Sequence, residues 1–488
     1  MKLSALFSEA GLPYPEKYGD REITKIVTDS REATAGCMFI SIVGHNNDGH
    51  DHIEEAVKKG ADVIVAEQVR DGCVGGAAIV KVENTRYAAA RLYNVQCGSP
   101  DKRLKIVGIT GTNGKTGTSF LLESIFLNAG ISCAVIGTLG CRINGIPTEL
   151  CRTGLTTPDS AQLYPFLAHL ANIGVDYVFM EVSSHALAMS RVEGIEFEYG
   201  IFTNLTRDHL DFHGGMEEYF ECKAALFSSC RRCVINVDSP YGKILAERYP
   251  EAIRCSCSSG DAVAESAVSD RDGSRYILKY SGGELPIRLT ALGDFFVTNS
   301  LLAAAVALDA KILADSIIGG LSSFSGVSGR MERVSSDGVD IIIDYAHTPD
   351  ALERLLINAH ALRQRGGRII LVFGCGGDRD RGKRKEMAHI ASRLADICVV
   401  TSDNPRSEDP NTIIGDILKG IDKEKPYTVI ASRKDAIRYA ISIGREGDMI
   451  LLAGKGHEKY EINAEGRSSL DEREIALAAL GEKRSGKL

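Results

Sequence analysis

The sequence predicts an α/β protein built on parallel sheets, and three observations indicate this class. Short apolar runs typical of buried strands alternate with helix-like segments through the last third of the chain. An apolar run at residues 104–110 leads into a glycine-rich turn and then a helix-like segment, which is the start of a βαβ unit. The strand-like runs end in polar sequences, and the carboxyl ends of strands are where doubly wound sheets bind ligands.

In chain order, a small mixed region is followed by a longer α/β region and then by a regular alternation of strands and helices. The expected strands lie at residues 63–67, 77–82, 104–110, 176–184, 200–205, 368–374, 397–403, 427–432 and 448–454. The main expected helices lie at residues 119–130, 383–395, 412–421 and 435–444. The final alternation favours a Rossmann-like, doubly wound C-terminal domain.

The chain is long enough for about three domains at ~150 residues each. It has 488 residues, and polar, turn-rich stretches interrupt the pattern at 98–102 and near 325–330. These breaks predict an N-terminal domain at residues 1–101, a central domain at 102–329 and a C-terminal domain at 330–488.

Composition restricts the class of function. Lysine and arginine total 57 against 65 aspartates and glutamates, so the formal charge of −8 argues against nucleic-acid binding through bulk charge. The sequence has no run of about 18 apolar residues that would indicate a membrane span, and its start does not resemble a secretory signal. Thirteen cysteines without such a signal favour reduced thiols in a cytoplasmic protein. We expect a monomer with no nucleic-acid or membrane partner.

Two groups of residues leave metal binding open as an alternative. The first is a CxxC and a CxC motif, formed by Cys230, Cys233, Cys255 and Cys257. Four thiolates could hold zinc, but the CxxC leads straight into a strand-like run, which favours structural cysteines. The second group is His45, His50 and His52. Their loop is rich in Gly, Asn and Asp, which favours a polar binding turn.

The most specific motif is the glycine-rich turn after the expected strand at residues 104–110. It consists of Gly111, Thr112, Asn113, Gly114, Lys115 and Thr116. Backbone N–H groups of such a turn cradle phosphate, Lys115 can reach the terminal phosphates, and the Thr116 hydroxyl can hold Mg²⁺. The turn is a shorter variant of the usual P-loop, because Ile109 stands where that loop has its first glycine. It predicts a central P-loop ATPase-type parallel sheet that binds ATP.

Three further segments follow in the order of a known family. Glu181 begins EVSSH after one expected strand, His209 lies in TNLTRDHLDFHG after the next, and Lys223 lies in YFECKAALF. Together with GTNGKT, they resemble the central ATPase domain of the Mur ligases. The resemblance implies that Glu181 and His209 bind Mg²⁺ together with Thr116. It also implies that Lys223 is carbamylated and helps to position the metal, whereas periodicity alone would make it an exposed helical lysine.

The resemblance extends to the segments that close over the nucleotide in this family. Arg330 lies in GRME, Asp344 begins DYAHTP, and Asn299 ends LGDFFVTN. Arg330 would contact phosphate, Asp344 the ribose and Asn299 the adenine side of ATP. The implied catalytic residues are Lys115, Lys223 and Arg330. Many members carry asparagine where Phe296 stands, which is a departure from the pattern.

The N-terminal region resembles the uridine-diphosphate-binding domain of the Mur ligases that add the third peptide residue. Ser30 lies in TDSR, and His45 and Asn46 lie in GHNNDGH. These residues would contact the uridine nucleotide of UDP-MurNAc-L-Ala-D-Glu. The implied contacts to its muramoyl-dipeptide are Thr156, Thr157, Ser183 and Arg191. Met189 stands where some members carry glutamine, so no contact is expected from it.

Two arginines after neighbouring expected strands indicate recognition of a carboxylate. Arg379 follows the strand at 368–374, and Arg406 ends DNPR after the strand at 397–403. Guanidinium groups hold carboxylates with two parallel hydrogen bonds. DNPR and GKGHE resemble the segments of Mur ligases that add meso-diaminopimelate, which has a second carboxylate that lysine lacks. The implied amino-acid-binding residues are Arg379, Asp403, Asn404, Pro405, Arg406, Gly454 and Glu458, with Glu458 taking the distal ammonium.

We therefore expect an ATP-dependent, amide-forming ligase of cytoplasmic peptidoglycan-precursor synthesis. It would join meso-diaminopimelate to UDP-MurNAc-L-Ala-D-Glu through an acyl phosphate and release ADP and phosphate. Positioning and charge neutralisation are the main demands of such phosphoryl transfer. Three alternatives remain open: a lysine-adding ligase of the same family, a folate-type polyglutamate ligase, and a nucleotide-binding switch without ligase activity.

Overall fold

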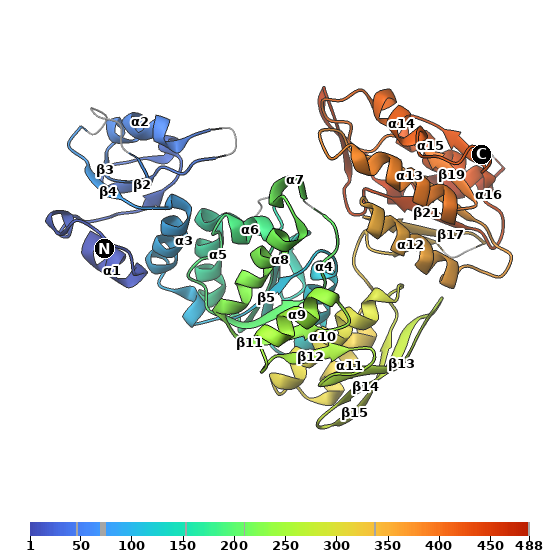
Figure 1. Ribbon diagram of the computed structural model, residues 1–488, viewed down its shortest axis with the longest axis horizontal. Helices are drawn as coiled ribbons and strands as arrows, with labels where there is room; N and C mark the ends of the chain where they lie inside the picture. The colour runs from blue at the N-terminus through green and yellow to red at the C-terminus, as the bar shows by residue number, and fades with distance from the viewer. Residues whose placement is uncertain (45–46, 69–74, 152–153, 209, 336–337, 487–488) are drawn as a thin grey trace. The chain divides into compact units, whose positions relative to one another are not determined.

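The computed structural model describes residues 1–44, 47–68, 75–151, 154–208, 210–335 and 338–486. It has the α/β fold that the sequence predicts (Figure 1). By its internal contacts the chain divides into two compact units. Unit 1 comprises Met1–Leu205, Glu217–Arg254 and Leu302–Leu313, and unit 2 comprises Thr206–Met216, Cys255–Leu301 and Ala314–Leu488. Each helix in the described ranges is too short or too polar to cross a bilayer. The three domain ranges drawn from the sequence stay a prediction.

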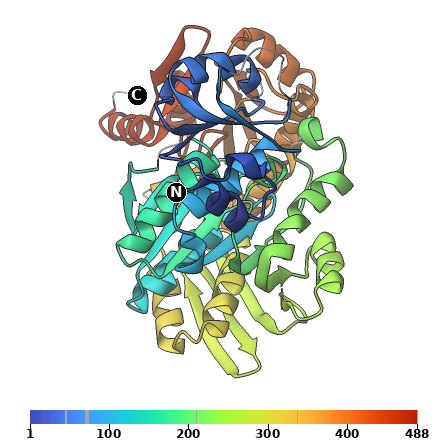
Figure 2. The same ribbon diagram turned by 90° about the vertical axis from the view of Figure 1, so that its left-hand side faces the viewer.

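The first hundred residues of unit 1 form a small parallel sheet with helices packed on it, drawn in blue and facing the viewer in Figure 2. Its strands are β1 (Ile26–Val27), β2 (Cys37–Ile40), β3 (Ala61–Ala66) and β4 (Ala78–Lys81), paired in that order. Its helices are α1 (Leu3–Ala10), α2 (Ile53–Lys58) and α3 (Thr85–Gln96). Phe39, Ile53 and Ile64 belong to the core between sheet and helix.

The rest of unit 1 is built on a five-stranded parallel sheet in the order β11-β10-β5-β9-β6. The strands are β5 (Lys105–Thr110), β6 (Cys133–Gly137), β9 (Tyr177–Glu181), β10 (Phe197–Phe202) and β11 (Cys230–Asn236), and β7 (Gly140–Ile143) and β8 (Ile146–Thr148) extend it in antiparallel fashion. The helices are α4 (Lys115–Asn128), α5 (Ser160–Asn172), α6 (Ser184–Ala188), α8 (Met216–Ala224) and α9 (Pro240–Arg248). Because β5 lies between β9 and β10, the segments after all three meet at one edge of the sheet.

Four of the expected strands end three residues before the predicted bound: β9 at Glu181, β10 at Phe202, and in unit 2 β19 (Ile397–Val400) and β20 (Tyr427–Val429). β10 is the expected strand at residues 200–205. Thr203 leaves the strand because its Oγ1 donates to Asn113 O at 2.6 Å and to Thr110 O at 3.2 Å. The end of β10 is thereby attached to the glycine-rich turn after β5.

Unit 2 contains a six-stranded, doubly wound sheet in the order β16-β17-β21-β18-β19-β20, parallel except for β16. The strands are β16 (Glu332–Ser335), β17 (Asp340–Asp344), β18 (Ile369–Phe373), β19 (Ile397–Val400), β20 (Tyr427–Val429) and β21 (Met449–Ala453). The helices are α12 (Pro349–Leu362), α13 (Gly382–Leu394), α14 (Pro410–Leu418), α15 (Arg433–Ile443) and α16 (Glu472–Arg484).

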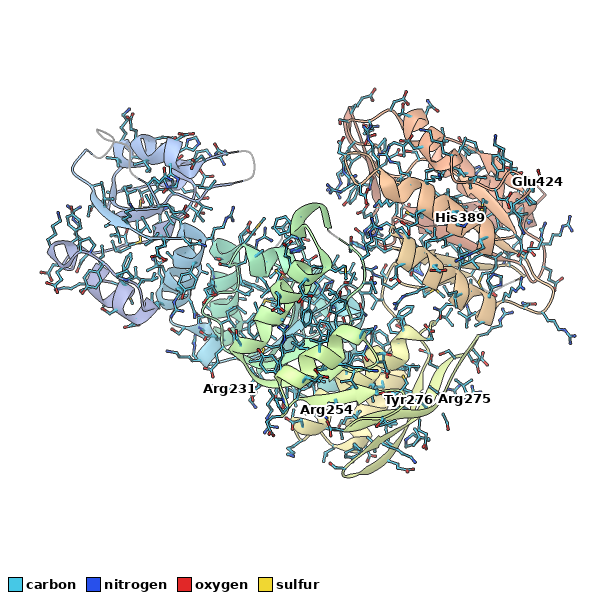
Figure 3. All side chains as sticks on the ribbon, in the orientation of Figure 1. Arg231, Arg254, Arg275, Tyr276, His389 and Glu424 are labelled. Carbon is cyan, nitrogen blue, oxygen red and sulfur yellow. The ribbon has the colours of Figure 1, made fainter. Side chains whose placement is uncertain are left out.

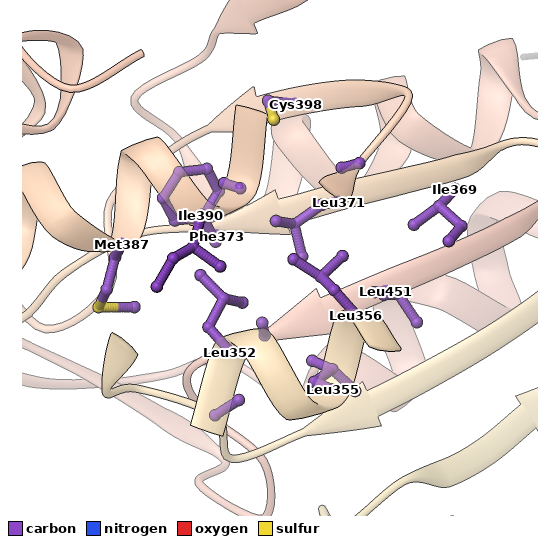
Figure 4. Close-up of a cluster of buried hydrophobic side chains, with 14 of the residues drawn as sticks. Leu352, Leu355, Leu356, Ile369, Leu371, Phe373, Met387, Ile390, Cys398 and Leu451 are labelled. Carbon is purple, nitrogen blue, oxygen red and sulfur yellow. The ribbon is translucent and has the colours of Figure 1, made fainter. Parts of the chain in front are cut away.

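Alternate residues of the central strands point to opposite faces of this sheet. Leu371 and Phe373 pack with residues of α12 and α13 (Figure 4), while Ile370 packs with residues of α15 and α16. Since both faces are buried, the strands are apolar throughout, which is why the sequence revealed them. His389 of α13 lies on the outer, exposed side of its helix (Figure 3).

Unit 2 also holds strands that the sequence analysis did not predict. After β12 (Ile253–Ser256) come β13 (Ala262–Asp270), β14 (Gly273–Tyr280) and β15 (Gly283–Leu289), and a hairpin joins β22 (Tyr460–Asn463) to β23 (Gly466–Ser469). On β14, Arg275 is exposed while Tyr276 is buried and hydrogen-bonds to Ser300 Oγ at 2.8 Å (Figure 3). The remaining α-helices are α7 (Leu210–His213) and α11 (Ala314–Ser323) in unit 2, and α10 (Phe295–Asp309), which begins in unit 2 and continues into unit 1 from Leu302.

Candidate active site

The turn between β5 and α4 requires glycine at its first position. Gly111 has φ +145° and Gly114 has φ +90°, a region that residues with a Cβ atom rarely adopt. A Cβ atom on Gly111 would lie 1.9 Å from Thr203 Oγ1, so the turn and the end of β10 could not approach as they do. Helix α4 begins directly after Gly114, so its first N–H groups are available to an anion.

We expect Gly111→Ala to destabilise unit 1 and to abolish nucleotide binding. The substitution adds backbone strain to a clash with the Thr203 side chain, so the free energy of unfolding should fall by about 3 kcal/mol or more. Gly130→Ala is the matched control, because Gly130 also has φ +73° but a Cβ atom there meets nothing within 4 Å. Thermal denaturation and calorimetric ATP titration measure both effects. Equal stability losses in the two variants would contradict the steric account.

Two lysine side chains converge on the carbonyl of Gly111. Lys115 Nζ donates to Gly111 O at 2.8 Å and to Thr112 O at 2.9 Å. Lys223 Nζ donates to Gly111 O at 2.9 Å and lies 4.7 Å from the centre of the Tyr219 ring. Lys223 is 1% exposed, so the interpretation as an exposed helical lysine is wrong. Two cations beside a phosphate-binding turn favour a polyanionic ligand.

Oxygen donors suitable for Mg²⁺ lie next to the same turn. Thr116 Oγ1 donates to Glu181 Oε2 at 3.1 Å, and Glu181 is fully buried at the end of β9. Thr138 holds both carboxylate oxygens, through its N–H at 3.0 Å and its hydroxyl at 2.9 Å. A hydroxyl and a carboxylate fit a hard cation. Lys223 as an ammonium cannot coordinate a cation, so it fits the metal only after carbamylation.

The structure identifies no further metal ligands among the residues that it describes. His209 lies outside the described residues, as do His45 and Asn46. Across the ranges that the structure does describe, no three or more His, Cys, Asp or Glu side chains form a group that could hold a metal ion. The four cysteines of the CxxC and CxC motifs therefore do not form a metal-binding group together.

The residues assigned to the muramoyl-dipeptide form one hydrogen-bonded network beside Glu181. Thr157 Oγ1 donates to Glu181 O at 2.8 Å and accepts from Ser183 N at 3.1 Å. Arg191 Nη1 donates to Thr157 O at 3.0 Å. Thr156 Oγ1 lies 3.1 Å from the hydroxyl of Thr138, the residue that holds Glu181. The network connects the candidate metal ligand to the candidate substrate contacts.

A cavity of about 240 Å³ lies beside this network within unit 1. Its lining includes Thr28, Arg86, Tyr93, Asp159, Met189 and Arg191. Burial lowers the pKa of Arg191, and the nearby charge of Arg86 acts in the same direction. Arg86 was not predicted, because a lone arginine on a helix carries no signal in the sequence. Ser30, two residues after Thr28, donates to Glu55 Oε2 at 2.7 Å and does not line the cavity.

Three residues assigned to ATP lie in unit 2. Asp344 Oδ2 and Oδ1 accept from the N–H groups of Met331 at 2.7 Å and Ala346 at 2.8 Å, and burial raises the pKa of Asp344. Arg330 stacks over the ring of Tyr345, 4.6 Å from its centre. Asn299 is 4% exposed. Its Nδ2 has no hydrogen-bond partner among the described residues, which leaves a donor for a ligand.

The two arginines predicted to bind a carboxylate come together beside Gly376. A Cβ atom on Gly376 would lie 2.9 Å from Arg406 Nη1 and 3.9 Å from Arg379 Cγ. Arg406 Nη1 donates to Gly377 O at 2.8 Å, which fixes its guanidinium, while Arg379 is exposed. Both follow neighbouring parallel strands, β18 and β19, as the sequence predicted.

The remaining amino-acid-binding candidates lie at the ends of β19 and β21. Asn404 Nδ2 donates to Glu458 Oε2 at 2.8 Å. Gly454 has φ +119°, and a Cβ atom there would lie 2.6 Å from Asp403 Oδ2, so the two loops touch at this glycine. Pro405, which precedes Arg406 in the chain, is buried. The two arginines predicted to bind a carboxylate and the glutamate predicted to bind an ammonium group therefore lie on adjoining loops.

A buried arginine that the sequence analysis missed supports the loop that carries Arg379. The Arg384 side chain is 0% exposed and contacts Glu408 at 2.8 Å and Asp416 at 3.0 Å. Its hydrogen bonds hold the pKa of Glu408 down, to about 2. Glu408 Oε1 in turn accepts from Asp378 N at 2.7 Å. In the sequence Arg384 lies in the charged run KRKE, which is typical of a solvated helix face.

Comparison with known proteins adds evidence on the family of the chain. Residues 22–109 match "Mur ligase family, catalytic domain", 109–307 the Mur ligase middle domain and 329–456 "Mur ligase, glutamate ligase domain". A UDP-N-acetylmuramoyl-L-alanyl-D-glutamate–2,6-diaminopimelate ligase of Syntrophomonas wolfei is 40% identical, over 98% of this chain and 99% of its own. The enzyme of that name from Gloeobacter violaceus is 41% identical, over 99% of each chain. A solved structure of that name superposes with a TM-score of 0.72, at 30% identity, over 99% of this chain and 100% of its own.

Proposed function

Because the chain belongs to the Mur ligase family and is therefore an ATP-dependent, amide-forming ligase, we propose that it adds meso-diaminopimelate to UDP-MurNAc-L-Ala-D-Glu. The observation that carries this choice of amino acid is the pair Arg379 and Arg406 at Gly376, with Glu458 on the adjoining loop. Diaminopimelate ends in a carboxylate and an ammonium, whereas lysine ends in an ammonium alone. The reaction belongs to cytoplasmic synthesis of peptidoglycan precursors.

The proposed roles in phosphoryl transfer follow from the turn after β5. Its backbone N–H groups hold the ATP phosphates, and Lys115 neutralises charge while the D-glutamyl carboxylate attacks the γ-phosphorus. ADP leaves and an acyl phosphate remains. Thr116 and Glu181 would hold Mg²⁺, joined by His209 and a carbamylated Lys223, and the cation would supply charge neutralisation at the phosphates. Arg330, Asp344 and Asn299 would bind phosphate, ribose and adenine.

In the second step, the amine of diaminopimelate attacks the acyl carbon and phosphate leaves. Arg379 and Arg406 would hold the distal carboxylate, and Glu458 the distal ammonium, so that only the reacting amine is presented. The cavity beside Thr157 and Arg191 would bind part of the UDP-muramoyl-dipeptide. Ser30, His45 and Asn46 are proposed to contact the uridine nucleotide.

The test is phosphate release by the purified protein with ATP, Mg²⁺, UDP-MurNAc-L-Ala-D-Glu and one amino acid at a time. We expect kcat/KM for meso-diaminopimelate to exceed that for L-lysine by about 10²-fold or more, because lysine leaves two guanidinium groups without their carboxylate. Preference for lysine would contradict the proposal in favour of the lysine-adding alternative. ATP binding without amino-acid-dependent phosphate release would favour a nucleotide-binding switch.

A further inference from the structure

A lysine that the proposed chemistry does not use lies buried between the two amino-acid-binding loops. The Lys455 side chain is 0% exposed. Its Nζ donates to Asn404 Oδ1 and to Tyr460 O, both at 2.9 Å, and lies 3.5 Å from Asp403 Oδ1. Burying an ammonium group is costly unless it is paired and hydrogen-bonded. Two of these three partners, Asn404 and Asp403, belong to the candidate recognition site.

Lys455 and the backbone N–H of Ile462 together fix which way the Asn404 amide points. Asn404 Oδ1 accepts from Lys455 Nζ at 2.9 Å and from Ile462 N at 3.0 Å, and its Nδ2 donates to Glu458 Oε2 at 2.8 Å. The reversed amide would place its NH₂ against two donors and its oxygen against a carboxylate. An ammonium group can only donate, so Lys455 permits one orientation of the amide.

The backbone around Lys455 is fixed by a buried ion pair. Arg433, the first residue of α15, donates to Glu472 Oε1 at 2.7 Å and to Ala453 O at 2.7 Å. Both side chains are at most 1% exposed. A positive charge at a helix N-terminus interacts unfavourably with the helix dipole. The position of Arg433 is therefore explained by its hydrogen bonds to Glu472 and Ala453 O, and not by stabilisation of α15. The pair anchors the end of β21, directly before Gly454 and Lys455.

We propose that Lys455 is a positioning residue for amino-acid recognition. It orients Asn404, whose amide holds Glu458 Oε2, and the carboxylate thereby presents Oε1 to the distal ammonium of the incoming diamino acid. The inference rests on the proposed function for the assignment of that ammonium to Glu458. The orientation of Asn404 itself does not depend on which amino acid is used.

The first test is a crystal structure and a kinetic analysis of Lys455→Met, which removes the donors but keeps an unbranched side chain that is only one atom shorter. We expect the Asn404–Glu458 hydrogen bond to be lost. We expect KM for meso-diaminopimelate to rise about tenfold, as for the loss of an oriented hydrogen bond to a charged group. KM for ATP should change less than about twofold. Lys459→Met is the matched control, because Lys459 is an exposed neighbour 3.0 Å from Asp471 Oδ2.

The second test separates positioning from a general structural role. 2-Aminopimelate lacks the distal amine, so its KM should be the same in the wild type and in Lys455→Met. Lys455→Gln keeps a donor for Asn404, and we expect it to restore the hydrogen bond and to bring KM for diaminopimelate within about threefold of the wild type. It also provides the test if Lys455→Met does not fold.

The outcomes separate this inference from the proposed function. An intact Asn404–Glu458 hydrogen bond in Lys455→Met would overturn the inference, whichever amino acid the enzyme uses. A comparable rise in KM for ATP would overturn it too, since that indicates general disruption. A lost hydrogen bond with an unchanged KM for diaminopimelate would overturn the role of Glu458 and with it the role of Lys455 in recognition. A wild type without activity on diaminopimelate would refute the proposed function, while the crystal structure still decides the orientation of Asn404.

Discussion

Lys115→Ala is expected to lower kcat for ligation by about 10³-fold while the protein stays folded. The Lys115 ammonium is held in the turn after β5 by Gly111 O and Thr112 O, where phosphate charge would develop in the transition state. Loss of one such electrostatic contact typically lowers kcat by about 10²–10³-fold, and removal of a full positive charge belongs at the upper end. The two lost hydrogen bonds are part-buried, so stability should fall by only about 1–2 kcal/mol.

The measurement is ADP formation in a coupled assay, with thermal denaturation to follow the fold. Lys105→Ala is the control, because Lys105 is exposed at the opposite, amino end of the same strand and contacts the ring of Tyr177. It should leave kcat unchanged. Turnover by Lys115→Ala within tenfold of the wild type, at normal stability, would refute the role of this lysine in phosphoryl transfer.

The strands that could be predicted most clearly from the sequence share one physical property, burial on both faces of a sheet. β5, β18 and β21 are buried on both faces, so each is a nearly continuous apolar run, and glycine or polar residues follow directly. β13, β14 and β15 are antiparallel, and their alternating or polar sequences are weaker signals. The antiparallel strands β13, β14 and β15 were therefore missed.

The same distinction applies to the candidate site. Gly111 to Thr116 are consecutive, so the motif could be recognised and its placement inferred from the strand before it. Lys455, Arg384 and Arg86 act through partners that are distant in the chain, such as Asn404 for Lys455 and Glu408 for Arg384. A sequence does not distinguish a lysine or arginine that is buried and paired from one that is exposed. Only the packing of unit 1 shows that Lys223 is buried and not exposed.

Arg406→Ala is expected to lower kcat/KM for meso-diaminopimelate by about 10²-fold, and to leave the weak use of L-lysine unchanged. The distal carboxylate would lose one of its two guanidinium partners, and truncation of one member of a hydrogen-bonded charge pair costs about 2–5 kcal/mol. About 2.7 kcal/mol corresponds to 10²-fold at 25 °C. The measurement is phosphate release with each amino acid over a range of concentrations. Arg365→Ala, an exposed arginine in the loop before β18, should change neither value.

The backbone at this position offers a second, independent readout. Arg406 has φ +52°, a left-handed conformation that costs a residue with a Cβ atom about 1–2 kcal/mol. Alanine keeps that strain and glycine relieves it, so Arg406→Gly should be more stable than Arg406→Ala by about 1 kcal/mol. Both variants should lose diaminopimelate selectivity equally, because both lack the guanidinium. Arg406 keeps a backbone strain that glycine would relieve. Such strain at the cost of stability is expected where the side chain itself is needed for function. Recovery of selectivity in Arg406→Gly alone would show that backbone shape, and not the charge of Arg406, selects the amino acid.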